Sequence, residues 1–129
     1  MIGALFALAF VLSDARAELT GWTLALSWEP GRCATAASRA CASSSRAGLV
    51  LHGLWTEGMG DEFCDVPPEA RAQDAKHDWC ALPSPGVTGK TERLLGTVMP
   101  GTADCLERHE WVKHGTCSGM PADAYFETA

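Results

Sequence analysis

The sequence predicts an α+β domain, because strand patterns fill its first half and helix patterns fill its second half. Residues 20–28 alternate large apolar side chains with small or polar ones, which is typical of a strand with one strongly apolar face. Residues 48–51 form a short apolar run that indicates a buried strand. Helical patterns follow at residues 69–79, 91–99, 104–115 and from 121 onward. The length of 129 residues fits one small domain.

The N-terminus predicts export. Residues 2–12 form an apolar run that is too short to span a bilayer, and Ala15-Arg16-Ala17 follows as a small-x-small cleavage pattern. We therefore expect a signal peptide over residues 1–17, a domain over residues 18–129, and no stable membrane association. The expected location is the periplasm or the extracellular space.

Charge and cysteine content narrow the class of protein. A net charge of −6 disfavours general nucleic-acid binding, which depends on neutralising phosphates, so a polyanion would have to be bound by a local basic site. All six cysteines follow residue 17, and an even number in an exported chain predicts disulfides. Six cysteines allow 15 pairings, and spacing alone does not choose among them; a Cys33–Cys41 bridge is one candidate, which would staple the Ala/Ser-rich stretch 34–46. The sequence has no C-x-x-C pair, which disfavours a zinc ribbon or a thioredoxin-like redox site.

The stretch Cys105–Cys117 is the strongest candidate for a functional site. Asp104 is a candidate helix cap with Glu107 three residues later, and Gly115 is a candidate stop. At about 100° per residue, one arc of roughly 140° holds six residues. They are Leu106, His109, Glu110, Lys113, His114 and Cys117. Four ionisable groups on a face that begins with leucine indicate a site more than a solvated surface.

The chemistry of this face follows from its groups. Glu110 and His114 are i,i+4 neighbours, so the carboxylate is expected to orient the imidazole and favour its protonated form. Lys113 and His109 add positive charge that suits an anion. A plain polar helix is the first alternative. A zinc site is disfavoured, because H-E-W-V-K-H has one residue more than H-E-x-x-H and places its histidines about 140° apart.

A second candidate group is His52, which we place at the end of the strand 48–51. A histidine at a strand end beside Gly53 lies where side chains reach a cleft, although a lone histidine there is more often a core residue. The helical stretch 69–79 also contains His77, which we expect on the surface.

Two segments together carry a family resemblance. His52-Gly53-Leu54-Trp55 and the later stretch His109–Cys117 resemble, in that order, the two active-site segments of the ribonuclease T2 family. Residues 24–33 resemble the first strand and loop of that family, and residues 105–108 and 123–126 resemble its bacterial periplasmic branch. The resemblance implies an antiparallel sheet with flanking helices.

The resemblance also implies a function. The implied function is that of a metal-independent endoribonuclease without a cofactor. Such an enzyme cleaves single-stranded RNA by attack of the ribose 2′-OH on the adjacent phosphorus, which gives a 2′,3′-cyclic phosphate. DNA, which lacks that hydroxyl, is expected not to be cut, and a monomer is expected. The implied site residues are His52 as general acid, His114 as general base, His109 as a phosphate or substrate contact, Glu110 and Lys113 as transition-state stabilisers, and Trp55 as a base-stacking aromatic. For Trp55, a purely structural core position is the alternative.

Bridges Cys64–Cys117 and Cys33–Cys41 are implied as well, which leaves Cys80–Cys105 as the third pair. The chain departs from the family pattern at Thr56, where proline is usual. Family members also continue beyond the second segment, so we expect a fold that is incomplete at the C-terminus, with an unpaired apolar sheet edge. The alternative functions are an inactive, truncated and disulfide-bridged exported binding protein, and a metallohydrolase that uses the same histidines.

Overall fold

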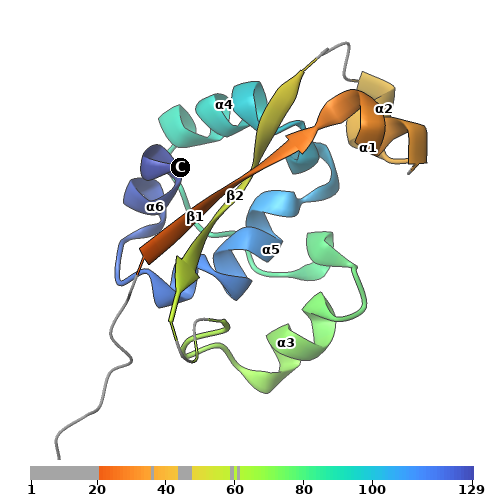
Figure 1. Ribbon diagram of the computed structural model, residues 1–129. Coiled ribbons are helices and arrows are strands. Elements are labelled where there is room, and N and C mark those ends of the chain that lie inside the picture. Colours follow the sequence, from red (N-terminus) through yellow and green to blue (C-terminus); the bar gives the residue numbers. More distant parts are fainter. Residues whose placement is uncertain (1–20, 36, 44–47, 59, 61) are drawn as a thin grey trace, which may run out of the picture.

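A computed structural model describes residues 21–35, 37–43, 48–58, 60 and 62–129 of the protein (Figure 1). Strands β1 (Gly21–Trp28) and β2 (Leu49–Glu57) pair antiparallel and cross in front of α5 (Leu106–Lys113). The other helices are α1 (Glu29–Thr35), α2 (Arg39–Ser43), α3 (Pro68–Asp74), α4 (Gly89–Val98) and α6 (Ala122–Thr128). Three short 3-10 turns lie at Trp79–Ala81, Pro100–Asp104 and Gly115–Cys117. The predicted α+β class is confirmed, and the predicted signal peptide lies outside the described residues.

β2 is longer than the sequence predicts. The strand does not end at His52 but continues through the H-G-L-W segment to Glu57. Its register with β1 shifts at His52, because Ala25 is opposite Gly53 whereas Leu26 is opposite Leu51. His52 is thus the extra residue of a β-bulge, a feature that redirects a side chain and is common beside active sites.

The hydrophobic core lies between β2 and the C-terminal helices. Leu51 and Leu54 of β2 pack in one cluster with Leu95, Met99, Leu106, Tyr125 and Phe126. The fully buried Tyr125 donates its hydroxyl hydrogen to the carbonyl oxygen of Leu54 at 2.6 Å, which satisfies the phenol and ties α6 to the strand. On the far side of α5 from its ionisable groups, Trp111 contacts Tyr125 edge to face and Val112 is buried. Helix α5 is therefore enclosed on both sides.

Some predicted helix boundaries are wrong. Asp104 does not cap α5, since its carboxylate accepts hydrogen bonds from the backbone N–H groups of Arg39 and Ala40 at the start of α2 (3.1 and 3.0 Å). Cys105, with a left-handed φ of 62°, precedes α5 instead. The stretch predicted as one helix over 69–79 divides into α3 and the separate turn Trp79–Ala81. None of the helices among the described residues has the length and apolarity needed to cross a membrane.

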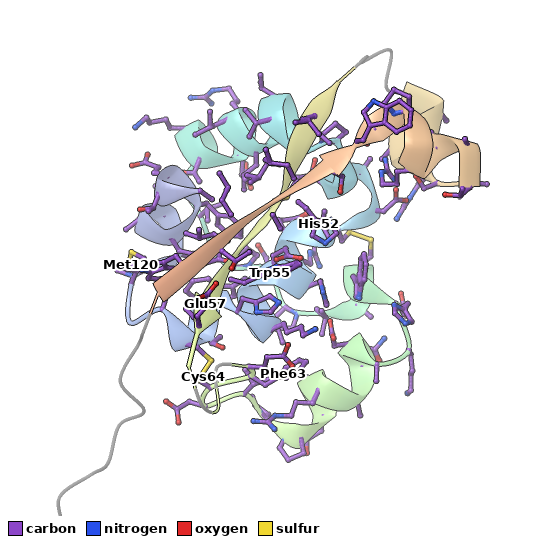
Figure 2. All side chains as sticks on the ribbon, in the orientation of Figure 1. His52, Trp55, Glu57, Phe63, Cys64 and Met120 are labelled. Carbon is purple, nitrogen blue, oxygen red and sulfur yellow. A yellow bond between two sulfur atoms is a disulfide. The ribbon has the colours of Figure 1, made fainter. Side chains whose placement is uncertain are left out.

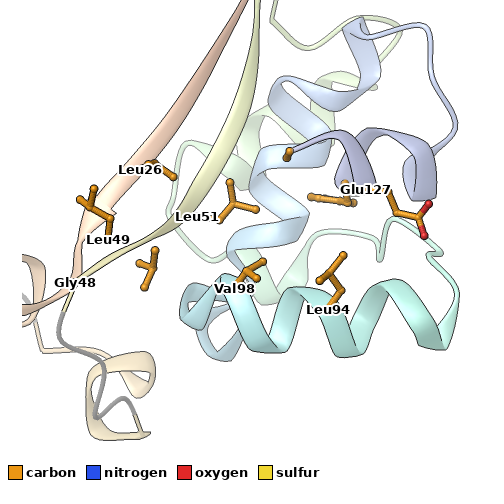
Figure 3. A pocket seen from close by; sticks show the side chains of 10 residues that line it. Leu26, Gly48, Leu49, Leu51, Leu94, Val98 and Glu127 are labelled. Atoms are coloured by element: carbon orange, nitrogen blue, oxygen red, sulfur yellow. The ribbon is translucent and has the colours of Figure 1, made fainter.

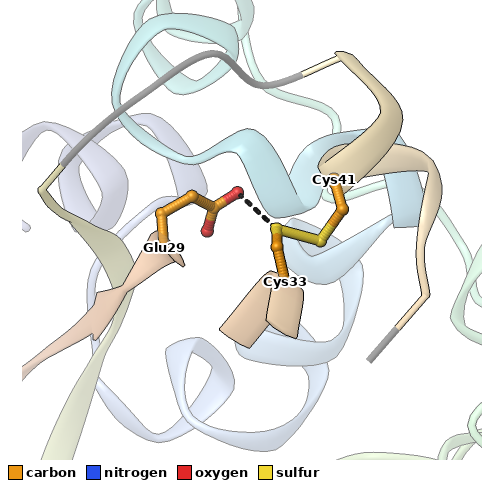
Figure 4. Close-up of side chains that lie close together, drawn as sticks. All are labelled: Glu29, Cys33 and Cys41. Carbon is orange, nitrogen blue, oxygen red and sulfur yellow. Dashed lines mark hydrogen bonds between the residues drawn. A yellow bond between two sulfur atoms is a disulfide. The ribbon is translucent and has the colours of Figure 1, made fainter. Parts of the chain in front are cut away.

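The structure contains three disulfides, Cys33–Cys41, Cys64–Cys117 and Cys80–Cys105, which are the pairs that the resemblance implies. The first joins α1 to α2 (Figure 4). The second joins the loop after β2 to the turn after α5, and the third joins the turn Trp79–Ala81 to the residue before α5. Two of the bridges therefore hold both ends of α5 against the rest of the chain.

The apolar face of β1 is open. Alternation along the strand is as predicted, but the large side chains are between 41 and 63% exposed. Leu24 and Leu26 are opposite Leu54 and Leu51 and so share the face of the sheet that carries these core residues, but the helices that cover β2 leave β1 uncovered. The exposed residues are Trp22, Leu24, Leu26, Trp28 and, on the neighbouring strand, Leu49. A groove of about 540 Å³ continues this face between the strands, α4 and α6 (Figure 3).

Leu24 and Leu54 provide a matched test of this asymmetry, because they are opposite each other across the two strands but are 51 and 5% exposed. We expect Leu54→Ala to lower the free energy of unfolding by about 2–5 kcal/mol. Leu24→Ala is expected to lower it by less than about 1 kcal/mol. Urea unfolding of the two oxidised variants measures both values, and equal losses would mean that the apolar side chains of β1 are covered in solution.

Candidate active site

The site forms where β2 crosses α5 (Figure 2). The bulge at His52 allows His52 and Trp55, three residues apart on one strand, to approach the same carboxyl group, that of Glu110. His52 Nε2 lies 3.3 Å from Glu110 Oε1, and Trp55 Nε1 donates a hydrogen bond to Glu110 Oε2 at 3.0 Å. On the β1 side, Ser27 Oγ lies 3.1 Å from His52 Nδ1. Regular alternation would have directed His52 and Trp55 to opposite faces.

Glu110 is completely buried against β2, and Gly53 makes this possible. A methyl group added at Gly53 would lie 1.9 Å from Glu110 Oε2, so only glycine leaves room for the carboxyl group. Among the described residues, Oε1 has no hydrogen-bond partner, although His52 Nε2 and His109 Nε2 lie 3.3 and 3.8 Å away. A buried carboxyl oxygen aimed between two imidazoles is unusual in a purely structural role, because an unpaired polar atom is costly.

The second segment supplies the other ionisable groups. His109 and His114 meet edge to face at a ring distance of 6.5 Å, and the ring of Trp55 stacks on His114 at 5.5 Å. Lys113 reaches Glu62 at 3.2 Å at the rim of the site. The expected orientation of His114 by Glu110 is wrong, because the Glu110 side chain turns to β2 and His114 Nδ1 has no hydrogen-bond partner among the described residues.

Burial shifts the pKa values of the central groups in the direction that favours their neutral forms. It raises the pKa of Glu110 to about 7, although the Trp55 hydrogen bond and the charge of Lys113 act in the opposite direction. Burial, followed by the charge of Lys113, lowers the pKa of His114 to about 4. The pKa of His52 is also lowered, first by burial and then by the charges of His109 and Arg32.

Two residues at the site were not predicted as site residues. Asp74, at the end of α3, lies 2.6 Å from His109 Nδ1, and Trp79 stacks on the His109 ring at 4.5 Å with an angle of 22° between the planes. In the sequence both belong to a mostly polar segment without a motif, so no pattern marked them. His77 in the same segment is exposed, as predicted.

Space for a ligand lies beside His52. A cavity of about 230 Å³ is lined by residues of β1, α1, β2 and the two turns that precede α5, among them Ser27, Arg32, His52 and Trp79. The described residues also place Glu29, Cys33 and Cys41 close together, a set of metal-ligand types (Figure 4). These sulfur atoms are joined in a disulfide and Glu29 pairs with Arg32 at 2.7 Å, so the set does not fit a metal ion.

The fold and the site together define a class: a disulfide-bridged α+β protein in which His52, His109 and His114 gather around the buried carboxyl group of Glu110. The chain belongs to the Ribonuclease T2 family, because the model of that family matches residues 20–129.

The chain is similar to ribonucleases from bacteria and a plant. It is 33% identical to Ribonuclease I of Escherichia coli, over 83% of this chain and 50% of the relative. It is 29% identical to Ribonuclease MC of Momordica charantia, over 79 and 51%. It is also 29% identical to a ribonuclease of Aeromonas hydrophila, over 87 and 44%. The chain thus spans about half the length of the curated relatives it matches.

The contact between Gly53 and Glu110 generates a prediction. We expect Gly53→Ala to displace the Glu110 carboxyl group and lower the free energy of unfolding by about 1–3 kcal/mol, through steric overlap and loss of the Trp55 hydrogen bond. Gly96→Ala in α4 is the matched control, because nothing lies within 4 Å of the added methyl group. That variant is expected to be as stable as the parent or more stable by up to about 1 kcal/mol. Equal urea midpoints for both variants would contradict the close contact.

Proposed function

We propose that the protein is a metal-independent endoribonuclease that cleaves single-stranded RNA by transphosphorylation. The observation that carries the proposal is the meeting of His52 from β2 with His114 and Glu110 from the second segment around the Trp55 ring. Membership of the ribonuclease T2 family supports it. In-line phosphoryl transfer needs a base at the nucleophile, an acid at the leaving oxygen and positive charge near the phosphate oxygens. The two histidines offer the base and the acid, and the neighbouring Lys113 offers the charge.

The proposed reaction assigns one proton transfer to each histidine. Neutral His114 takes the proton from the ribose 2′-OH, and the 2′-oxygen forms a bond to the adjacent phosphorus. The bond from phosphorus to the 5′-oxygen breaks as protonated His52 donates its proton to that oxygen. The products are a 2′,3′-cyclic phosphate and a free 5′-OH, and the two histidines exchange their protonation states.

The electrostatics of the site suit these roles. A pKa of about 4 leaves His114 neutral, and so able to act as a base, over most of the pH range. Lys113 and Glu110 are proposed to stabilise the pentacovalent phosphorus, Lys113 by positive charge and Glu110 by a shared proton, and His109 is proposed to contact the phosphate or the substrate. The pKa of about 7 for Glu110 means that its carboxyl group carries a proton in mildly acidic solution and can donate it as a hydrogen bond.

The substrate class follows from the same groups. Trp55 is proposed to stack on a base of unpaired RNA, since its ring is only half-buried and lies beside His114. DNA lacks the attacking hydroxyl and is not cut. We further propose that the protein acts as a monomer after export, in line with three disulfides, which persist in oxidising compartments.

The first test incubates the oxidised protein with single-stranded RNA in excess EDTA and analyses the products for 2′,3′-cyclic phosphate ends. We expect cleavage that His52→Ala and His114→Ala each reduce roughly 100- to 10,000-fold. His77→Ala is the matched control, because His77 is exposed and lies outside the site.

The outcomes separate the alternatives. Inability of the oxidised protein to cut RNA would contradict the proposal in favour of a bridged binding protein without activity. Cleavage that chelation abolishes would instead indicate a metallohydrolase, and full activity of either histidine variant would refute the assigned roles.

The pH profile of kcat/KM gives an independent prediction. As the pH increases, activity is expected to rise through pH 4, where His114 loses its proton and becomes a base. Activity is then expected to decrease as the pH rises further and His52 loses the proton that it donates, with a midpoint below 6.5 because the pKa of His52 is lowered from that value. In Lys113→Met, removal of the nearby charge raises the pKa of His114, so the acidic limb moves to higher pH. A flat profile between pH 4 and 8, or an acidic limb that Lys113→Met leaves in place, would contradict this assignment.

A further inference from the structure

His109 differs from the other histidines of the site in how firmly it is held. Its side chain is 15% exposed, and three of its sides are occupied. Asp74 Oδ1 lies in hydrogen-bond contact with Nδ1 at 2.6 Å, the Trp79 ring covers one face at 4.5 Å, and the His114 ring stands against it edge to face. The remaining nitrogen, Nε2, points to the centre of the site, 3.8 Å from Glu110 Oε1.

We propose that Asp74 is a positioning residue that fixes the proton of His109 on Nδ1 and thereby presents Nε2 to the substrate. The proposal rests on the proposed function for its effect on activity, but the contact itself is independent of that function. Asp74 accepts the Nδ1 hydrogen whether or not His109 is charged, so a neutral ring must carry its only proton on Nδ1.

The surroundings of Asp74 favour this role over a plain surface ion pair. The Asp74 side chain is 8% exposed, although it ends a short helix that is otherwise mostly exposed. A buried carboxylate is costly unless it is paired, and Asp74 is paired with His109, which lies 35 residues away in the sequence on another element. Burial of the Asp74 charge has a desolvation cost that an exposed ion pair does not have, and the contact with His109 compensates for this cost.

Trp79 completes the support. Its ring is nearly parallel to that of His109 and prevents rotation about the bond that carries the imidazole. The turn Trp79–Ala81 is itself held by Cys80, whose disulfide to Cys105 ends one residue before α5. Asp74 thus sets the direction of the ring in its plane, and Trp79 sets the plane.

The first measurement is the tautomer of His109, read by long-range proton–nitrogen NMR of the oxidised protein at a pH where the ring is neutral. We expect the proton on Nδ1 in the parent. In Asp74→Ala it moves to Nε2, the position that an unconstrained imidazole favours. Asp74→Leu, which fills the site with a side chain that has no acceptor, is the second variant if the alanine variant does not fold, and the Nε2–H fraction is expected to rise there too. An unchanged tautomer in the folded variants would overturn the proposal, whatever the activity on RNA.

The second measurement is RNA cleavage. Asp74→Ala is expected to lower kcat/KM roughly ten- to hundredfold, mainly through KM, because a misdirected Nε2 loses its contact with the substrate. The exposed Asp78→Ala is the matched control and is expected to be unaffected. In a His109→Ala background, Asp74→Ala should have no further effect. A loss of the same size in that background would mean that Asp74 acts through general stability, and would overturn the proposal.

Absence of cleavage by the parent protein would refute the proposed function alone, since the tautomer measurement would still decide the role of Asp74. A shifted tautomer together with unchanged kcat/KM in an active protein would show that Nε2 does not meet the substrate, and would overturn the positioning role.

Discussion

The contact between the Glu110 carboxyl group and the backbone of Gly53 is the constraint on which the structure around the site depends. It brings α5 so close to β2 that no other residue fits at position 53 without displacement of the carboxyl group. The same closeness excludes water from Glu110, and this burial is the main cause of its raised pKa. The packing of one helix against one strand thus sets both the shape of the site and its proton affinities.

The other parts of the fold maintain this contact. Tyr125 bonds to the carbonyl oxygen of Leu54, next to Gly53, and packs against Trp111 on the opposite side of α5. The bridges at Cys64–Cys117 and Cys80–Cys105 hold the two ends of α5. They therefore resist separation of helix and strand, which would hydrate Glu110.

Two short motifs were enough to identify the side chains that meet at Glu110, and period-two alternation was enough to predict β1. The details that make the site work had no local signal. The bulge at His52 depends on the register with β1, which residues 48–51 alone do not encode. Asp104 met the residue requirements for a cap of α5 but bonds to α2, because capping depends on which backbone N–H groups come near in three dimensions. Alternation likewise predicted an apolar face of β1, but it contains no information on what covers that face.

That open apolar face has a practical consequence for the behaviour of the chain in salt. Large exposed side chains such as Trp22 and Trp28 beside the groove of Leu26 and Leu49 form a continuous hydrophobic surface. Salts such as ammonium sulfate strengthen hydrophobic association, since sulfate is excluded from protein surfaces. The chain should therefore precipitate at lower ammonium sulfate concentrations, and bind more tightly to a phenyl resin, than its net charge of −6 alone implies. The negative charge of the molecule keeps it dispersed only while the salt concentration is too low to drive association through this apolar face.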